Sequence, residues 1–262
     1  MAASNPNGLY NANMGSHPLG GITQSGSSGS FTYEAKTDMG DKPVNYVSIG
    51  DAMRFTNWIN NGQGAATTES GAYDMTQSLS TVDHNGSANV WLPTENEWYK
   101  AAYYQPAAAG GDTDSYWLYA TQSNSAPTIA TVDANGNITN DGANVANYIK
   151  GAIWNGQTGN VTTVGSAGAT SDSYYGAYDL GGNVWEWNEA ISGSDRGVRG
   201  GSWIAPGNTL PASFRVTPPP TFEDAALGFR LASAVPEPSR LMLTLAGMCV
   251  LLLRRRRLPS AL

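Results

Sequence analysis

The stretch GAYDLGGNVWEWNEA, residues 176–190, places one glutamate between two tryptophans, directly after a Gly-Gly-Asn sequence. The run NVWEW alternates as a strand does, so Val184 and Glu186 share one face while Trp185 and Trp187 share the other. We expect the two tryptophans to pack inward. Glu186 then either takes part in a reaction or holds an ion that stabilises the fold.

The oxygen atoms of this stretch suit a hard cation. Ca²⁺ takes six to eight oxygens at about 2.3–2.6 Å, from carboxylates and from backbone carbonyls that glycines allow to turn inward. Asp179 and Glu186 supply the carboxylates. Acids near glycines are also common in turns, so Asp179 could instead cap a turn, and Glu186 could be a hydrogen-bonded acid beside the tryptophans. The spacing alone leaves both interpretations open.

The composition indicates one large, loop-rich domain with appendages. The chain has 262 residues and 40% hydrophobic content, which is enough for a substantial core. Glycine (31), tryptophan (8) and tyrosine (13) are abundant, whereas charged residues make up only 13%. This balance favours an irregular, aromatic-rich fold over a helix bundle. Exported proteins often share it.

The charge balance and the cysteine count exclude several classes of function. The formal net charge is −7, and five of the 14 basic residues are Arg240 and residues 254–257. The remaining nine basic residues stand against 21 acidic ones, which disfavours nucleic-acid binding and favours divalent cations as partners. The only cysteine is Cys249, so the globular part holds no disulfide, thiolate cluster or paired-thiol redox centre.

Two amphipathic helices are predicted. In SIGDAMRFTNWINNG, residues 48–62, Ser48 and Asp51 form a capping box, and Gly62 ends the helix. Its apolar face is predicted to carry Ala52, Phe55, Trp58 and Ile59. In WLPTENEWYKAAYY, residues 91–104, Thr94 is the N-cap and Glu97 its reciprocal partner. The residues predicted to face the core are Trp98, Ala101 and Ala102.

Beyond residue 105 the helical period gives way to short strand-like runs. Asn-Gly pairs at 135–136 and 155–156 mark turns. Three runs are typical of strands: NVWEW (183–187), GVRGGSWI (197–204) and LGFRLAS (227–233). The fold class predicted from the residues is therefore α+β with long irregular loops.

The two ends of the chain differ from its middle. Residues 1–41 are rich in Gly, Ser and Asn, and the start MAASNPNG has neither the basic nor the apolar region of a signal peptide. At the other end, Pro236-Glu237-Pro238 precedes the uncharged, mostly apolar run 241–253 and four arginines. That run covers about 20 Å of a hydrocarbon core of about 30 Å, which indicates a short membrane anchor. The arginines would lie in the cytoplasm and the body outside.

This tail, residues 234–262, resembles the PEP-CTERM sorting signal of Gram-negative bacteria, which exosortase is thought to recognise and remove. The resemblance implies export, a membrane-anchored stage, and transfer to the cell surface or extracellular matrix. Since export needs an N-terminal signal, we expect the natural protein to be longer at its start.

Five motifs run in order through residues 42–233: KPVNYVSIGDAMRFTNWIN, WLPTENEWYKAAYY, GAYDLGGNVWEWNEA, RGVRGGSWI and LGFRLAS. Together they resemble the formylglycine-generating enzyme family, also called the sulfatase-modifying factor domain. The resemblance implies a C-type-lectin-like fold, a twisted antiparallel sheet with two flanking helices and long irregular loops. The family pattern also has a strand and a helix ahead of the point where this chain begins. Their loss would leave a sheet edge or a helix face uncovered.

In that family the tryptophan-flanked loop holds a calcium ion. Carried over to this chain, the resemblance implies four ligands: the side chains of Asp179 and Glu186 and the carbonyls of Gly182 and Val184. Asp179 stands where some relatives have asparagine. A second calcium site maps near Asn147 and Tyr148, on a loop whose length differs here.

The resemblance also implies where a reaction centre would lie. Aerobic members oxidise a substrate cysteine to formylglycine with copper held by two cysteines, shortly after a Gly-Gly-Ser-aromatic strand. In this chain that strand is residues 200–203, and the two positions are Ala205 and Leu210. Neither side chain binds Cu(I), which selects soft thiolates, so copper is not expected.

The sequence gives little support for an iron site or for an anion-binding site. The two histidines, His17 and His84, lie in contexts typical of exposed loops and are too few for an iron site. Arg199, Arg215 and Arg230 could bind an anion, but arginines in such a setting more often pair with acids or lie over aromatic rings.

We therefore expect an exported, surface or matrix-associated, non-catalytic module with structural Ca²⁺, which binds polysaccharide or protein. The alternative is a formylglycine-generating-type oxidoreductase, or another protein-modifying enzyme, with non-standard chemistry.

Overall fold

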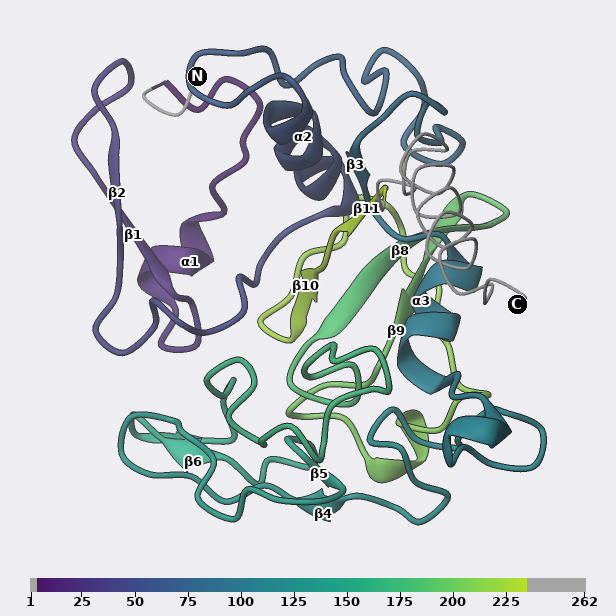
Figure 1. Ribbon diagram of the computed structural model, residues 1–262. Coiled ribbons are helices and arrows are strands. Elements are labelled where there is room, and N and C mark those ends of the chain that lie inside the picture. Colours follow the sequence, from purple (N-terminus) through teal and green to yellow (C-terminus); the bar gives the residue numbers. More distant parts are fainter. Residues whose placement is uncertain (1–3, 235–262) are drawn as a thin grey trace, which may run out of the picture. The chain divides into compact units, whose positions relative to one another are not determined.

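The computed structural model describes residues 4–234, whose course Figure 1 traces. By its internal contacts the chain divides into a first unit, Met1–Ala232, and a second, Ser233–Leu262. The sorting-signal and membrane-anchor predictions fall on residues 235–262, outside the described residues. Within residues 4–234, no helix has the length and apolar character needed to cross a membrane.

A three-stranded sheet carries the tryptophan-flanked motif (Figure 1). β8, Trp185–Ser192, lies between β9, Asp195–Arg199, and β10, Leu227–Phe229. β9 is antiparallel to β8, whereas β10 is parallel to it. The prediction of an antiparallel sheet is therefore wrong at this edge. The physical reason is that the long connection after β9 returns the chain to the starting end of β8, as a parallel neighbour requires.

β8 is buried on both faces, which differs from the predicted alternation. Trp187 is fully buried but Trp185 only half-buried, while Val184 and Glu186 on the other face are each 4% exposed. The prediction that both tryptophans pack inward holds fully for Trp187, whereas Trp185 packs against the same hydrophobic cluster and stays half-buried. Helix α3, Glu95–Tyr103, contacts β8 and helps to keep solvent from the glutamate.

Both predicted helices form, and each begins with its predicted capping box. α2 spans Ile49–Asn60 after Ser48, and α3 follows Thr94. In each, the N-cap hydroxyl accepts from the backbone N–H three residues on, and that residue's carboxylate accepts from the N-cap N–H. A further short helix, α1, Ala12–Ser16, lies in the N-terminal part, where none was predicted.

Of the face predicted for α2, Ala52 is fully buried, but the helix turns another stripe to the core beside it. Its buried residues include Ile49, Ala52, Met53 and Thr56, whereas Phe55 is 41% exposed. Both stripes of this helix carry apolar side chains, so contact with the sheet, not periodicity, decides which one is covered.

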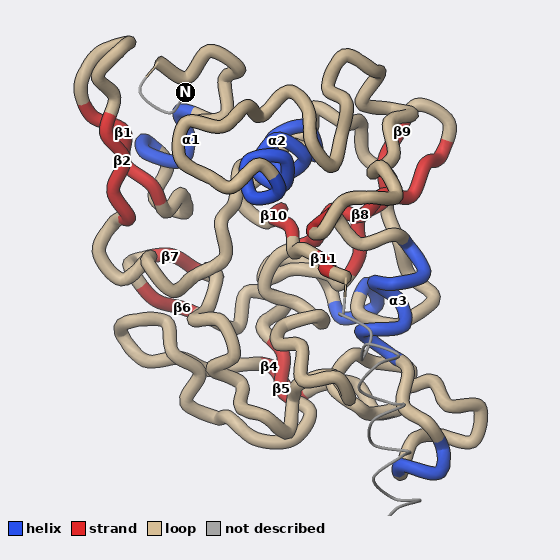
Figure 2. The backbone as a smooth tube through the Cα atoms, turned by 45° about the horizontal axis from the view of Figure 1, so that its top comes forward, coloured by secondary structure: helices blue, strands red, loops and turns tan. Residues whose placement is uncertain are grey.

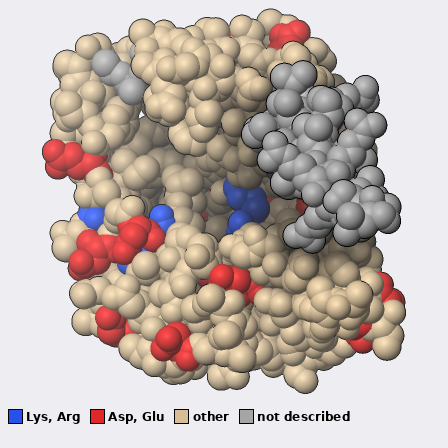
Figure 3. Space-filling view, in the orientation of Figure 1, with Lys and Arg blue, Asp and Glu red and all other residues tan. Residues whose placement is uncertain are grey.

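The other stripe of α2 faces an open cavity. Phe55 and Trp58 line this cavity of about 730 Å³, together with residues of the N-terminal segment and of β10. Its lining also includes Arg54 and Arg230, and Figure 3 shows a hollow on this face with basic side chains inside it.

Short two-stranded sheets and long loops make up the rest, as the mostly tan tube of Figure 2 shows. β1, Ile22–Ser25, pairs antiparallel with β2, Thr32–Ala35. The predicted turn at Asn155-Gly156, with φ of 51° and 69°, joins β6, Ile153–Trp154, to β7, Gln157–Thr158. The remaining strands are β3 (Val90–Trp91), β4 (Thr128–Ile129), its parallel neighbour β5 (Val145–Ala146) and β11 (Ala232–Ser233). The elements are those of an α+β chain with few helices.

Candidate functional site

The Glu186 carboxylate lies at the centre of the tryptophan-flanked motif, and both of its oxygens accept hydrogen bonds. From α3, the Trp98 indole N–H donates to Oε2 at 2.7 Å. From the turn after β10, Arg230 donates through Nε to Oε2 and through Nη2 to Oε1, each at 2.5 Å. The same guanidinium donates to the Tyr178 carbonyl at 2.9 Å. Segments far apart in the sequence thus close over this acid.

Asp179 lies near this ion pair, in the left-handed backbone region with a φ of 55°. Its Oδ2 accepts from the Gly165 N–H at 2.9 Å. Burial raises the pKa of Asp179 to about 6; the Gly165 hydrogen bond and the charge of Arg230 oppose this rise, and the charge of Glu186 adds to it. The loop therefore gathers two carboxylates around one guanidinium.

The glycine of the motif allows a close approach to Asn147. Gly182 has a φ of 85°, and a Cβ at this position would lie 2.4 Å from the Asn147 carbonyl oxygen, so glycine is required. The Asn183 N–H donates to that carbonyl at 2.8 Å. The Asn147 side chain is buried, and its Oδ1 accepts no hydrogen bond from the described residues. Val184, the fourth residue of the predicted calcium loop, packs in a hydrophobic cluster.

This geometry bears on the predicted calcium site. The Glu186 oxygens accept N–H groups from Arg230, and a calcium ion would need the same lone pairs. Within residues 4–234, no group of three or more His, Cys, Asp or Glu side chains is placed to hold a metal ion. Glu186 therefore fits calcium only if Arg230 moves away, whereas the Asn147 Oδ1 is an unengaged oxygen. Calcium at this loop stays a prediction.

The two positions that match the copper-binding cysteines of the resembled family lie in the hydrophobic interior. Ala205 is 5% exposed and Leu210 is 1% exposed. Leu210 packs in a cluster with Ala146 and Tyr148. Leu210 thus serves packing, and Ala205 is buried from solvent.

Arg199 has the structural role that was predicted for the arginines. It ends β9, earlier than the predicted strand 197–204, because residues 200–201 are glycines with φ of 97° and 75°. Its guanidinium pairs with Glu95 of α3. It also donates to the carbonyls of Ala212 and Phe214, at 2.7 and 2.8 Å. No open anion site results at this arginine.

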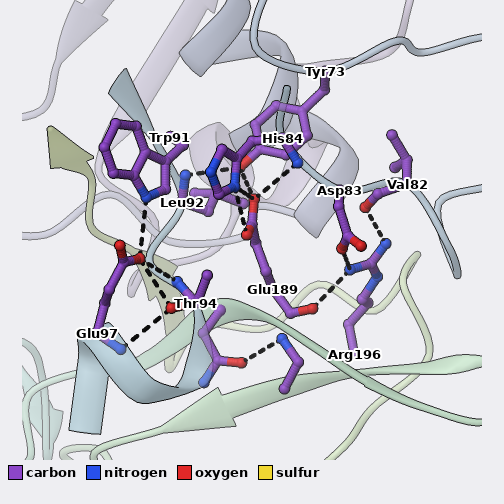
Figure 4. A network of polar contacts seen from close by, with 12 residues as sticks. Tyr73, Val82, Asp83, His84, Trp91, Leu92, Thr94, Glu97, Glu189 and Arg196 are labelled. Atoms are coloured by element: carbon purple, nitrogen blue, oxygen red, sulfur yellow. Dashed lines mark hydrogen bonds and ion pairs between the residues drawn. The ribbon is translucent and has the colours of Figure 1, made fainter. Parts of the chain in front are cut away.

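A second buried acid, Glu189 of β8, organises a network that sequence reasoning missed (Figure 4). Its carboxylate accepts from the Tyr73 hydroxyl at 2.6 Å and lies 2.8 Å from Nδ1 of His84. Its backbone carbonyl accepts from Arg196 at 2.9 Å. The His84 ring also stacks on Trp91, with centroids 5.0 Å apart. Figure 4 shows the carboxylate pointing toward His84 and Tyr73.

The network corrects the prediction for His84. Its side chain is 23% exposed and is held by the acid, so it is not a free loop histidine. A carboxylate at Nδ1 fixes the orientation of an imidazole ring. Arg196 meanwhile donates to the carbonyls of Leu79 and Val82. These contacts hold the irregular segment before β3 against β8 and β9. No local sequence pattern predicts the network, because His84 and Glu189 are 105 residues apart.

Comparison with known proteins gives a family and a fold. The model of the sulfatase-modifying factor enzyme 1-like domain matches residues 15–235. Among solved structures, CarF is similar at 23% identity with a TM-score of 0.50, over 82% of this chain and 76% of that one. PvdO from Pseudomonas aeruginosa is 16% identical with a TM-score of 0.44, over 81% and 68% of the two chains. Treponema denticola variable protein 1 is 20% identical with a TM-score of 0.43, over 74% and 72%. A search of curated proteins found no match.

Proposed function

The chain belongs to the family of the sulfatase-modifying factor enzyme 1-like domain, and from this membership we propose that it is a non-catalytic binding module. The observation that carries the proposal is the burial of Ala205 and Leu210, the second of which packs in a hydrophobic cluster. These are the positions at which the family resemblance puts the copper-binding thiolates, and neither side chain offers Cu(I) a lone pair. The only cysteine of the chain, Cys249, lies outside the described residues.

For the fold, the proposal includes the C-type-lectin-like arrangement. The central sheet with α2 and α3 packed near it supports this, as does the likeness to CarF at a TM-score of 0.50. Long loops on a rigid core suit binding, because a loop surface can change without disturbing the core beneath it.

The C-terminal tail adds a destination to the proposal. Residues 236–238, the apolar run 241–253 and the final arginines support export through a PEP-CTERM-type route. The proposed partners are an exosortase-type sorting machinery, the membrane during transit, and a polysaccharide or protein at the cell surface or in the matrix. Ca²⁺ remains the proposed structural ion. Its proposed ligands at the tryptophan-flanked loop are Asp179, Gly182, Val184 and Glu186. Asn147, whose Oδ1 is unengaged among the described residues, belongs to the second proposed site.

One assay separates this module from the enzyme alternative. The purified full chain is supplied with Cu(I) and oxygen and incubated with a cysteine-containing sulfatase peptide, and mass spectrometry measures formylglycine. We expect no conversion above that of the peptide alone, because residues 205 and 210 cannot ligate copper. A family member that has both cysteines serves as the positive control. Conversion that depends on copper and oxygen would overturn the proposal.

A further inference from the structure

Six tyrosine side chains form an unbroken series of ring contacts that begins in the core and ends at the surface. In the order in which each ring contacts the next, they are Tyr103, Tyr99, Tyr116, Tyr104, Tyr175 and Tyr174. Their successive centroids lie 5.0, 5.5, 5.2, 6.5 and 5.3 Å apart. The innermost ring is 1% exposed, whereas Tyr116, Tyr174 and Tyr175 are 36%, 41% and 52% exposed. The four outer rings, Tyr116, Tyr104, Tyr175 and Tyr174, are called the tyrosine platform below.

Three segments of the chain contribute to the tyrosine platform: the end of α3, the segment around Tyr116 and the loop around Tyr174. Tyr104 caps the C-terminal end of α3 and forms a β-bridge with Tyr116. Lys100 of the same helix lies over the Tyr104 ring, with its Nζ 5.5 Å from the centroid. Tyr174 and Tyr175 come from the loop before the tryptophan-flanked motif. Because the rings already contact one another, they lose little conformational freedom when a ligand binds.

Packing inside the domain does not account for the outer end of the platform. The ring contacts of Tyr174 and Tyr175 are with each other and with Tyr104, and large parts of both rings remain in solvent. Exposed apolar patches on soluble proteins mark sites of interaction. Tyrosine is enriched at such sites, because it offers a large, rigid contact area together with a hydroxyl group.

We propose that the tyrosine platform binds a neutral polysaccharide. This inference rests on the proposed binding function and names its site and its ligand class. The apolar C–H face of a sugar ring can stack on an aromatic ring, and phenol hydroxyls can exchange hydrogen bonds with sugar hydroxyls. The rings of Tyr104 and Tyr175 stack with their planes 16° apart, and Tyr175, which is 52% exposed, leaves the most ring surface of the four for a sugar.

Charge decides between a neutral and an acidic polysaccharide. Asp112 and Asp114 lie on the segment that leads to Tyr116, and neither of them is buried. Lys100 is the basic residue that contacts the platform, and the whole chain carries a net charge of −7. A surface of this sign repels polyanions such as polyuronates.

Affinity gel electrophoresis of the full chain tests the proposal, with a mixed-linkage β-glucan, a galactomannan or alginate cast in the gel. We expect at least one neutral polymer, but not alginate, to retard the protein. Tyr175→Ala and Tyr116→Ala should each weaken the retardation by about fivefold or more, and Tyr175→Trp should preserve it. The matched control is Phe222→Ala, since Phe222 is 46% exposed and has no ring contact with the platform.

Each contrary outcome overturns the proposal. These outcomes are retardation by alginate alone, no retardation by either neutral polymer, and retardation that both alanine variants leave unchanged. Capture of a matrix protein that the same variants abolish, without any glycan binding, would assign the platform to a protein partner instead. Thermal unfolding of every variant controls for misfolding, and two separate alanine variants keep the test valid if one fails to fold. The copper assay stays independent, because loss of glycan binding creates no oxidase activity.

Discussion

At the scale of single residues, the protein depends on buried charges that are paired within the fold. Glu186 is held by Arg230 and Trp98, and Arg196 is fully buried among backbone carbonyls. A buried ion pair contributes little net stability, but removing one partner leaves an uncompensated charge in the interior. Variants at these residues therefore report on the fold, and function has to be measured separately.

Arg230→Gln should lower the free energy of unfolding by about 3 kcal/mol, because Glu186 would lose its cationic partner. The Arg230 side chain is 26% exposed, which places the effect at the lower end of the range for buried pairs. Urea denaturation measures the change. The double variant Glu186→Gln, Arg230→Gln is the control and should be more stable than Arg230→Gln alone. A double variant that is less stable would contradict the argument.

The response to calcium should depend on the same arginine. Since Arg230 and a calcium ion would compete for the Glu186 oxygens, removing the arginine should strengthen calcium binding at this loop. We expect millimolar Ca²⁺, compared with EDTA, to raise the Tm of Arg230→Gln by about 4 °C or more, and that of the unmodified protein by less. Thermal unfolding measures both shifts. A larger shift in the unmodified protein would show that the ion and the arginine do not compete.

Asp179 should make stability fall as the pH rises from about 4 to about 6. Its pKa in the folded protein, about 6, exceeds the ordinary 3.8, so the folded state binds the proton more tightly. This stabilisation is complete below the ordinary pKa and is lost as the pH passes through the folded one, at most about 3 kcal/mol. Asp179→Asn should flatten this part of the profile in chemical denaturation with EDTA present. Equal slopes in the two proteins would refute the assignment.

At the scale of elements, polar side chains on helices and strands hold the irregular segments in place. Asn57 of α2 donates to the carbonyls of Thr68 and Tyr73, at 2.8 and 2.9 Å, and accepts from the Tyr73 N–H at 2.7 Å. Glu189 of β8 accepts from the hydroxyl of the same tyrosine. The segment between α2 and β3 is thus held by α2 and by β8. The hydrogen bonds of Asn57 also satisfy backbone groups of this segment that have no partner in a helix or strand.

Tyr73→Phe should destabilise the protein by about 1–3 kcal/mol, although it removes only one oxygen. The hydroxyl donates to Glu189 and also accepts from the Leu92 N–H at 2.8 Å, so two buried groups lose a partner. Chemical denaturation compares this variant with Tyr178→Phe, whose side chain is 46% exposed and which should change stability by less than about 0.5 kcal/mol. Similar effects of the two substitutions would rule out a special role for the network.

At the scale of the whole molecule, the sheet organises separate hydrophobic clusters on its two sides. One cluster joins Trp187 to α2, and another joins Trp98 to the segment around Leu180. A smaller cluster contains Leu210, where the resembled enzymes would have a copper ligand. On the face drawn in Figure 3, basic side chains lie inside the central hollow, and others lie beside acidic side chains at the left of the face. The interior thus supports packing at Leu210.

Leu210→Ala should lower the free energy of unfolding by about 2–5 kcal/mol, because it opens a cavity in that cluster. Leu210→Met, which nearly conserves the volume, should cost less than about 1.5 kcal/mol. Ile204→Ala is a nearby control, since Ile204 is 45% exposed. Urea denaturation of the three variants gives the order. If Leu210→Ala cost no more than Ile204→Ala, position 210 would not be a packing site.

The sequence by itself determined the features that depend on neighbours along the chain. The capping boxes at Ser48 and Thr94 formed as predicted, because each joins residues three positions apart. The turn at Asn155-Gly156 formed because these two residues tolerate positive φ. The ordered motifs also sufficed to identify the family, which the match over residues 15–235 confirms.

Only the tertiary structure decided which distant groups meet. It paired Glu186 with Arg230, 44 residues on, and His84 with Glu189, 105 residues on. It also chose which apolar stripe of α2 is buried and placed β10 parallel to β8. Local sequence patterns report the secondary-structure propensity and the periodicity of a segment. The direction of a long connection and the partner of a buried charge depend instead on the path of the whole chain. For this reason the sequence located the candidate loop, whereas only the fold showed that Arg230 donates hydrogen bonds to the carboxylate of Glu186 in that loop.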